Sequence, residues 1–195
     1  MNKKYFTIDE LVEKIEGQNG KVCQQILTEN RMLFEKAQGS TFNHQTWEGG
    51  YIDHVTDGMN LCVHLFEFMS SFGRQLPFTL SDALLVFFLH DIEKPWRIVV
   101  DEAGNVSNRE GCTTKEDFEK FRNEKLAEYG IVLDEAQQNA MKYVEGEYKG
   151  YSSTKRAQNK LAAFCHMVDT WSARIWHNYP KEQDTWSEAG RFRNS

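Results

Sequence analysis

Apolar residues recur three or four positions apart along most of the chain, which is the spacing of amphipathic helices. Polar, Gly-bearing stretches such as residues 38–50 separate the apolar runs. The pattern predicts helices over residues 7–17, 21–37, 51–72, 79–90, 113–130, 134–144 and 154–176. We therefore expect a protein whose core is formed by packed helices.

Capping patterns mark the starts of several of these helices. In such a pattern a Ser, Thr or Asp is followed three positions later by an acidic residue or Gln, and the two exchange hydrogen bonds at the helix N-terminus. The pairs are Thr7 with Glu10, Thr113 with Glu116, and Asp134 with Gln137. Thr79 or Ser81 is expected to cap the helix over residues 79–90, and Pro95 to end it, because proline cannot continue a helical hydrogen-bond pattern.

Residues 96–107 depart from the helical pattern. Ile98, Val99 and Val100 are β-branched, and a Gly-Asn turn follows them, so a minor β-hairpin is expected here. The predicted fold class is all-α with this one hairpin. Since no repeat, low-complexity tract or Pro/Gly-rich linker interrupts the chain, we expect a single domain over residues 1–195, with a core over about 22–178 and a polar tail over 179–195.

Composition narrows the classes of function. The formal net charge of −6 argues against a stable nucleic-acid partner held by a broad basic surface. No apolar run has the length of a membrane span, and the N-terminus lacks the apolar segment of a signal peptide. The four cysteines, Cys23, Cys62, Cys112 and Cys165, form no CxxC pair, so we expect reduced thiols in a cytoplasmic protein. The oligomeric state is left open.

Four residues on three predicted helices stand out as costly to bury. His54 lies in the first turn of one helix, His90 and Asp91 close another, and Asp169 lies in the last. Neutral imidazole and carboxylate are common ligands of divalent metal ions, and coordination offsets the cost of burying them. Spacing alone leaves two interpretations: polar residues satisfied separately, or ligands that converge on one ion.

The flanking residues resemble the HD-domain metal-dependent phosphohydrolases. The ordered pattern is a histidine in "GGYIDHV" (His54), the pair in "LHDIEKPW" (His90 and Asp91) and a distant aspartate in "HMVDTWSAR" (Asp169). The second motif is similar to His-Asp-Ile-Gly-Lys, with Glu93 in place of Gly. The third is similar to the corresponding segment of HD-type 3′→5′ exoribonucleases. These motifs span about residues 44–176.

This resemblance implies an HD-domain helical bundle in which the four residues hold a divalent ion that activates a water for attack on phosphorus. Asp91 would also orient that water. Lys94, with Arg174, would stabilise charge on the phosphoryl group, while Glu93 and Glu145 are candidate acid/base residues. The N and O ligands suit Mn, Fe, Co, Ni, Zn or Mg.

The chain lacks the additional histidines that many two-metal HD enzymes carry between the His-Asp pair and the last aspartate. Val144 and Glu145 stand where two such histidines would fall, so a second ion would depend on Glu145 or Glu147, with His166. We therefore expect one tightly held ion. His44 precedes the first metal helix and is expected to line the mouth of the pocket or to be an ordinary loop residue.

The function implied by the resemblance is hydrolysis of a phosphate ester or anhydride, with a small nucleotide as the favoured partner. One alternative is a 3′→5′ exonuclease on short nucleic acid, although the chain has no room for the β-domain that usually accompanies that activity. The other is a degenerate HD domain that binds a nucleotide without turnover.

Overall fold

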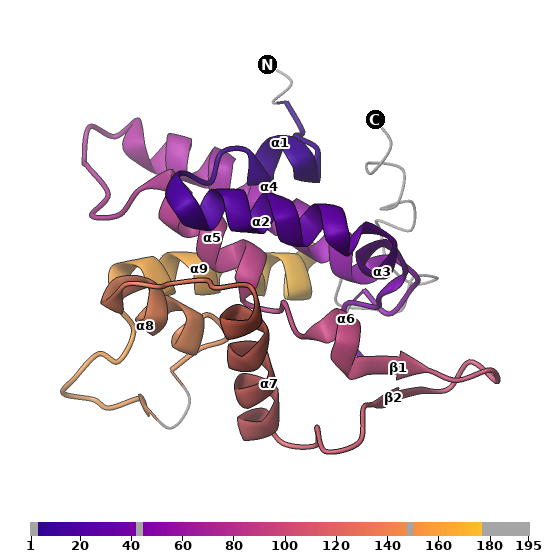
Figure 1. Cartoon of the computed structure of the whole chain (residues 1–195). Coiled ribbons are helices and arrows are strands. Elements are labelled where there is room, and N and C mark those ends of the chain that lie inside the picture. The colour runs from indigo at the N-terminus through magenta and orange to yellow at the C-terminus, as the bar shows by residue number, and fades with distance from the viewer. Residues whose placement is uncertain (1–3, 42–44, 148–149, 177–195) are drawn as a thin grey trace.

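The computed structural model describes residues 4–41, 45–147 and 150–176, and within these ranges helices dominate (Figure 1). The elements are α1 (Ile8–Val12), α2 (Gly17–Glu29), α3 (Arg31–Lys36), α4 (Gly50–Ser70), α5 (Leu80–Leu89), α6 (Lys94–Arg97), β1 (Ile98–Val100), β2 (Val106–Asn108), α7 (Lys115–Glu128), α8 (Glu135–Tyr143), α9 (Lys160–Thr170) and the π-helical segment η2 (Trp171–Trp176). The all-α fold class with one small hairpin is confirmed.

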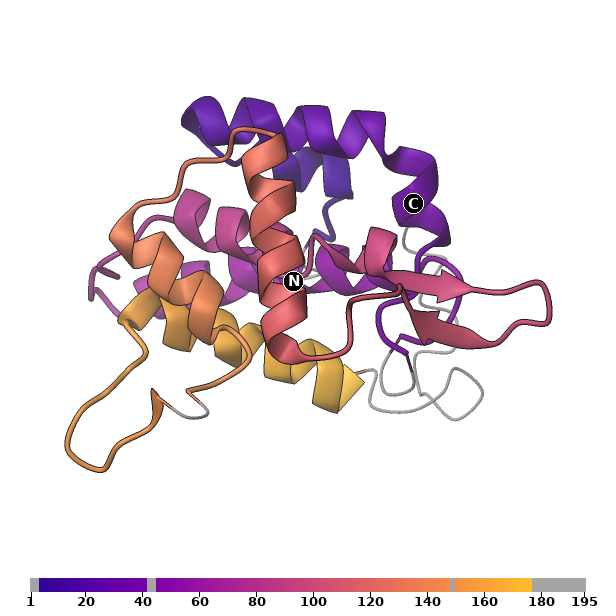
Figure 2. The ribbon, with the colours of Figure 1, turned by 60° about the horizontal axis from the view of Figure 1, so that its bottom comes forward.

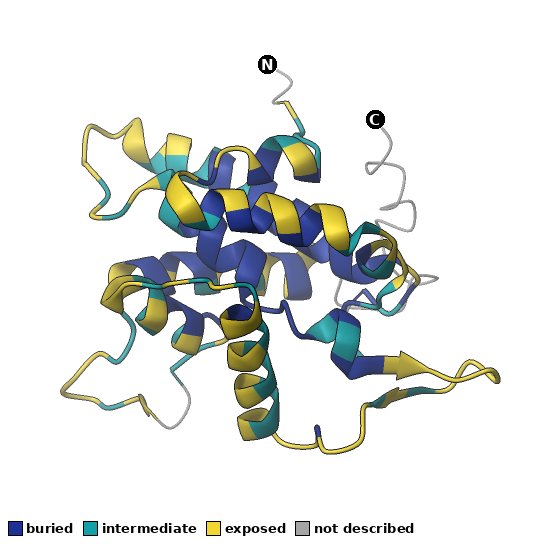
Figure 3. Cartoon of the chain, viewed as in Figure 1, coloured by how far each residue is buried: buried dark blue, intermediate teal, exposed yellow. Residues whose placement is uncertain are grey.

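The centre of the molecule is formed by α4, α5 and α9, which pack against one another. Helices α1 and α2 cover α5 on one side, and α8 packs against both α5 and α9. Every residue of α5 from Ala83 to Leu89 is buried, and Figure 3 shows the same dark-blue burial along much of α4. A helix that is apolar all round can only lie inside the fold, so α5 carries the His-Asp pair that follows it into the interior.

A glycine allows α4 and α5 to approach closely. Gly58 is buried within α4, and a Cβ atom placed there would lie 2.0 Å from Cε1 of Phe87 on α5. The Phe87 ring therefore occupies the space that any other residue at position 58 would fill. The Phe87 ring also contacts the two histidines of interest. Its centroid lies 5.6 Å from the centroid of the His54 ring and 4.6 Å from that of the His90 ring.

The hairpin projects from the helical body, as Figure 2 shows, and α7 crosses the front of the molecule in that view. Strands β1 and β2 are antiparallel, with Ile98 opposite Asn108 and Val100 opposite Val106. The expected hairpin over residues 96–107 is thus confirmed to within two residues. On α7, the Phe118 ring packs under the guanidinium of Arg97, 3.9 Å from its centroid.

Several predicted boundaries are wrong, each for a local reason. The helix over 79–90 ends at Leu89, and Pro95 lies in the first turn of α6, where its missing N–H has no intrahelical partner to lose. The run over 21–37 begins at Gly17 and divides into α2 and α3. At the division the side chain of Asn30 donates to the Ile26 carbonyl at the end of α2, at 2.9 Å.

Two helix starts also differ from the sequence expectation. The capping box of α7 pairs Thr114 with Asp117, one position later than predicted, because the Asp117 carboxylate accepts from the Thr114 backbone N–H at 2.8 Å. The last helix begins at Lys160 rather than at residue 154. Its N-cap is Asn159, whose side chain accepts from the Ala162 N–H at 2.7 Å. The boxes of α1 and α8 are confirmed, and α5 is capped by Thr79.

The core extends further toward the N-terminus than expected. Ile8, Leu11, Val12 and Ile15 belong to the buried cluster, so α1 is part of the core that was predicted to begin near residue 22. The polar tail over 179–195 lies outside the described residues. All four cysteines are buried with free thiols. None of the helices in the described ranges has the length and apolar character of a membrane span.

Replacing Gly58 with alanine should destabilise the protein by about 1–3 kcal/mol, because the added methyl overpacks the α4–α5 contact against Phe87. This runs against the intrinsic helix preference, which favours alanine over glycine by about 1 kcal/mol. Thermal unfolding followed by circular dichroism measures the change, and Gln24→Ala on the exposed face of α2 is the control, expected to be near neutral. A Gly58→Ala variant as stable as the wild type would contradict the close contact.

Candidate metal centre

His54 reaches the interior from the second turn of α4. Its imidazole is fully buried, and its Nδ1 lies 3.1 Å from Oγ of Ser172 in η2. The same Ser172 hydroxyl accepts from Nε2 of Gln45 at 3.2 Å, so the segment before α4 and the η2 segment both support this histidine. With Nδ1 occupied by the serine, Nε2 is the nitrogen that faces the other polar residues.

His90 is the C-cap residue of α5 and is also fully buried. Its Nδ1 lies 2.6 Å from the backbone carbonyl oxygen of Phe87, an acceptor, so Nδ1 carries a proton and donates it. Nε2 is then the ring atom available to bind a cation. The turn itself is held from α7, since Arg122 donates from an Nη atom to the His90 carbonyl at 2.6 Å.

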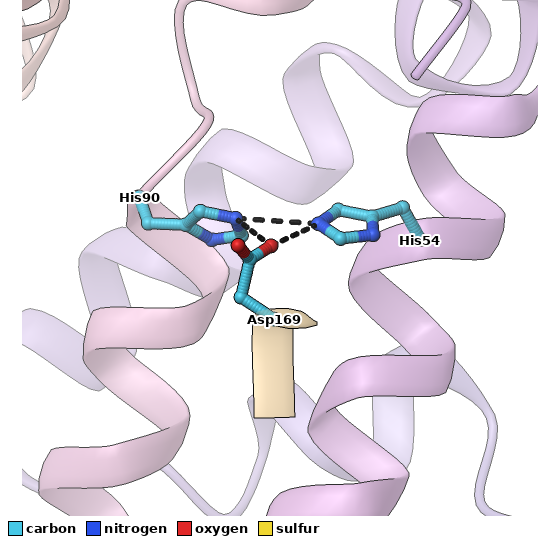
Figure 4. Close-up of side chains that lie close together, drawn as sticks. All are labelled: His54, His90 and Asp169. Atoms are coloured by element: carbon cyan, nitrogen blue, oxygen red, sulfur yellow. Dashed lines mark hydrogen bonds and ion pairs between the residues drawn. The ribbon is translucent and has the colours of Figure 1, made fainter. Parts of the chain in front are cut away.

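Asp169, near the end of α9, completes a compact group with these two histidines. Figure 4 shows the three side chains pointing toward one another from three helices. Nε2 of His54 lies 3.3 Å from Nε2 of His90 and 3.3 Å from Oδ1 of Asp169, and Nε2 of His90 lies 3.6 Å from that oxygen. Ligands about 2.1 Å from an ion in tetrahedral coordination lie about 3.4 Å apart, so this triangle has the dimensions of three ligands of one ion.

Asp91 lies at the edge of the same group. Its Oδ2 is 3.1 Å from Nε2 of His90 and 3.6 Å from Nε2 of His54. The same oxygen also lies 2.5 Å from Nζ of Lys94, so a cation already neutralises it from the other side. The structure therefore brings His54, His90 and Asp169 together as a group that could hold a metal ion, and Asp91 lies at its edge, shared with Lys94.

Electrostatics in the group favour a bound positive charge. Burial opposes an imidazolium at His90, but the Asp91 charge and hydrogen bonds to Asp169 and Asp91 raise the pKa of His90 to about 10. Burial lowers the pKa of His54. Burial also disfavours the Asp169 carboxylate, yet the two histidines outweigh it and hold the pKa of Asp169 below its usual range. Two Nε2 atoms facing each other at 3.3 Å need a proton or a cation between them, since two lone pairs repel.

The group adjoins a cavity of about 1020 Å³. Asp91 and Lys94 line it, so the polar cluster is reached from the cavity through these two residues. Residues of α6 and α7 and the end of α8 form its walls, including Glu93, Arg97, Lys115, Phe118, Arg122, Tyr143 and Glu145. A ligand of nucleotide size fits within this volume.

The remaining predicted site residues differ in whether they line this cavity. Glu93 is buried and lines the cavity beside Asp91. Glu145 lies at the cavity margin, where its carboxylate is 3.2 Å from Nζ of Lys115. Arg174 is exposed on η2 and is not among the described residues that line the cavity. His44 lies outside the described residues.

The residues expected to support a second ion have other partners. Nδ1 of His166 lies 2.7 Å from the Val144 carbonyl, and one carboxylate oxygen of Glu147 accepts two backbone N–H groups, from Ala157 and Gln158, each at 2.9 Å. Within the described ranges, neither residue belongs to the group of potential ligands around His54.

Three supporting residues carried no signal in the sequence. Ser172 lies inside the "HMVDTWSAR" motif but had no assigned role, whereas its Oγ contacts Nδ1 of His54. Gln45 contacts Ser172, 127 positions away, and Arg122 contacts the His90 carbonyl, 32 positions away, so local pattern shows nothing of either contact. Only the three-dimensional packing brings them together.

Comparisons with known proteins found no match to a family model, to a curated protein or to a solved structure. The assignment of class therefore depends on the site itself. The protein is an all-α chain with a buried group of His54, His90 and Asp169 that could hold a metal ion.

A divalent ion such as Mn²⁺ should raise the melting temperature, because it binds the folded arrangement and not the unfolded chain. At a concentration 100 times the dissociation constant the gain is about 2.7 kcal/mol. Asp169→Asn should remove most of this shift, since the amide keeps the shape of the carboxylate but loses its charge. His64→Ala is the control, because His64 lies on α4 away from the group and contacts the Lys4 carbonyl. An unchanged shift in Asp169→Asn would exclude this ligand set.

Ion binding should release about one proton near neutral pH, and affinity should rise about tenfold per pH unit up to the pKa of His90. The sign follows because a raised pKa keeps His90 protonated in the ion-free protein, and the ion must displace that proton. His54, with its lowered pKa, contributes little. Calorimetric titration in two buffers of different ionisation enthalpy counts the protons. A count of zero would contradict the protonated state of His90.

Proposed function

We propose that this protein is an HD-type metal-dependent phosphohydrolase that acts on a small nucleotide. The observation that carries the proposal is the triangle of His54, His90 and Asp169, with ligand atoms 3.3–3.6 Å apart, placed next to a cavity. The motif resemblance and the donor set agree, since two imidazoles and a carboxylate suit a hydrolytic divalent ion.

Cationic side chains in the inner cavity support an anionic substrate. Lys94, Arg97 and Arg122 line the cavity together with Asp91 and Glu93. Lys94 is paired with Asp91 and Arg97 with Glu93, so Arg122 is the surplus positive charge among these five residues. At the outer margin Lys115 and Glu145 form an ion pair and so largely neutralise each other. A chain of net charge −6 attracts an anion only through local cationic groups, and we infer that Lys94 and Arg122 serve in this way.

A divalent ion bound by the group would lower the pKa of a coordinated water and neutralise charge on the phosphoryl oxygens. Asp91 would orient the attacking water, and the support for this role is that its Oδ2 lies within 3.6 Å of Nε2 of both His54 and His90. Lys94 would contact a phosphoryl oxygen, and the support for this role is that its ammonium lies 2.5 Å from the Asp91 carboxylate and that the residue lines the cavity. Burial and the hydrogen bond from Nδ1 to the Phe87 carbonyl fix the His90 ring.

Hydrolysis should depend on both the ion ligands and Lys94. We expect Asp91→Ala to abolish turnover, and Lys94→Met to lower kcat/KM by about 100-fold through loss of charge stabilisation in the transition state. Phosphate release from mononucleotides, nucleoside triphosphates and short oligonucleotides, each tested with several divalent ions, measures the activity. Lys120→Met, a 79% exposed lysine on α7, is the matched control with unchanged activity.

The products distinguish the favoured substrate from its alternative. Phosphate release from nucleotides supports the proposal, whereas stepwise release of mononucleotides from oligonucleotides would point to an exonuclease instead. A metal-loaded protein that hydrolyses none of these compounds would overturn the enzymatic function.

A further inference from the structure

Glu93 occupies an unusual position in the cavity. It stands two residues after Asp91, where the similar motif has glycine, and it is only 2% exposed while still lining the cavity. A buried carboxylate is costly unless it is paired or hydrogen-bonded. Its partners therefore decide what this residue does.

Within the described ranges, the hydrogen bonding of Glu93 and its neighbour Arg97 is incomplete. Oε2 of Glu93 and Nε of Arg97 are both buried and have no hydrogen-bond partner there. The closest approach between the two charged groups is 3.6 Å, from Arg97 Nε to Glu93 Oε1, which is an ion pair without a hydrogen bond. One acceptor and one donor are thus unpaired in two neighbouring residues that line the cavity.

Other contacts hold Arg97 in this position. An Nη atom donates to Oδ1 of Asn108 on β2 at 2.6 Å, and the guanidinium stacks on the Phe118 ring, 3.9 Å from its centroid. The Nε atom cannot turn to meet Glu93 directly without giving up these contacts. These two contacts therefore hold the unpaired Arg97 donor in place.

A hydroxyl group can satisfy both atoms at once. Its O–H donates to Glu93 Oε2, and its oxygen accepts from Arg97 Nε. A phosphate oxygen at the same place would be repelled by the carboxylate, and an ammonium by the guanidinium. Because Asp91 lines the same cavity, a substrate with its phosphate at the metal group can bring a sugar hydroxyl to this wall.

We propose that Glu93 and Arg97 form a hydroxyl-binding subsite that selects substrates with a sugar hydroxyl near the phosphate. The subsite rests on the proposed function, because it deepens the choice of substrate at the same cavity. A site that hydrogen-bonds a substrate hydroxyl rejects the analogue that lacks it, since its own buried polar groups are then left unpaired.

The test uses ribonucleoside 5′-monophosphates of the four bases together with their 2′-deoxy and 3′-deoxy analogues, in the presence of Mn²⁺. We expect the wild type to prefer the ribonucleotide over one of the two deoxy analogues by at least about tenfold, in kcat/KM and in dissociation constant. Glu93→Leu should reduce this ratio to near one. Glu93→Gln should keep part of it, because the amide oxygen still accepts from a hydroxyl.

Glu124→Gln is the control, an equivalent change on α7 outside the cavity, and it should preserve the full ratio. A ratio compares two ligands on the same variant, so a partial loss of folded protein does not affect it. Equal hydrolysis of all analogues by the wild type, or a ratio unchanged in Glu93→Leu, would overturn the subsite while leaving the hydrolase proposal intact.

Binding is measured separately so that the two proposals fail in different ways. Discrimination in calorimetric binding without any turnover would support the subsite and overturn the hydrolase. Absence of both binding and hydrolysis across the whole panel would overturn both.

Discussion

The contact between α4 and α5 at Gly58 and Phe87 is the constraint on which the site depends. Because Gly58 has no side chain, the Phe87 ring of α5 packs directly against α4, and the His54 and His90 rings lie 5.3 Å apart, centroid to centroid. The Phe87 residue contributes twice, since its ring fills the space beside Gly58 and its carbonyl fixes the His90 ring. The apolar packing of the core therefore sets the geometry of the polar group.

The polar group is stable in the interior only as a set. Two carboxylates and two imidazoles would each be costly to bury alone, but together they exchange proton and charge, and Lys94 balances Asp91 from the cavity side. A divalent cation satisfies the same set more completely than a proton does, because it contacts three ligand atoms at once. The arrangement that compensates burial is thus the same group of side chains that could hold a metal ion.

Much of this could be predicted from the sequence because it is encoded locally. Helical spacing, the Thr7 and Asp134 caps and the β-branched residues 98–100 each act within a few positions, and those elements form as expected. The convergence of His54, His90 and Asp169 was predicted from ordered motifs, and the geometry confirms it. Local pattern failed where a tertiary contact decides the outcome, as at Asn30, whose side chain also donates to the hydroxyl of Tyr129, 99 positions away.

One residue of the hairpin, Asn108, contacts a residue that lines the cavity, Arg97. Asn108 holds Arg97 from β2, and it can do so only because pairing with Ile98 sets the alternation of side chains along the strand. One residue gained or lost at the tip, between positions 101 and 105, leaves that alternation intact. The same change within β2 would turn the amide of Asn108 to the opposite face. Homologous sequences should therefore tolerate length variation at the tip and resist it in the strand.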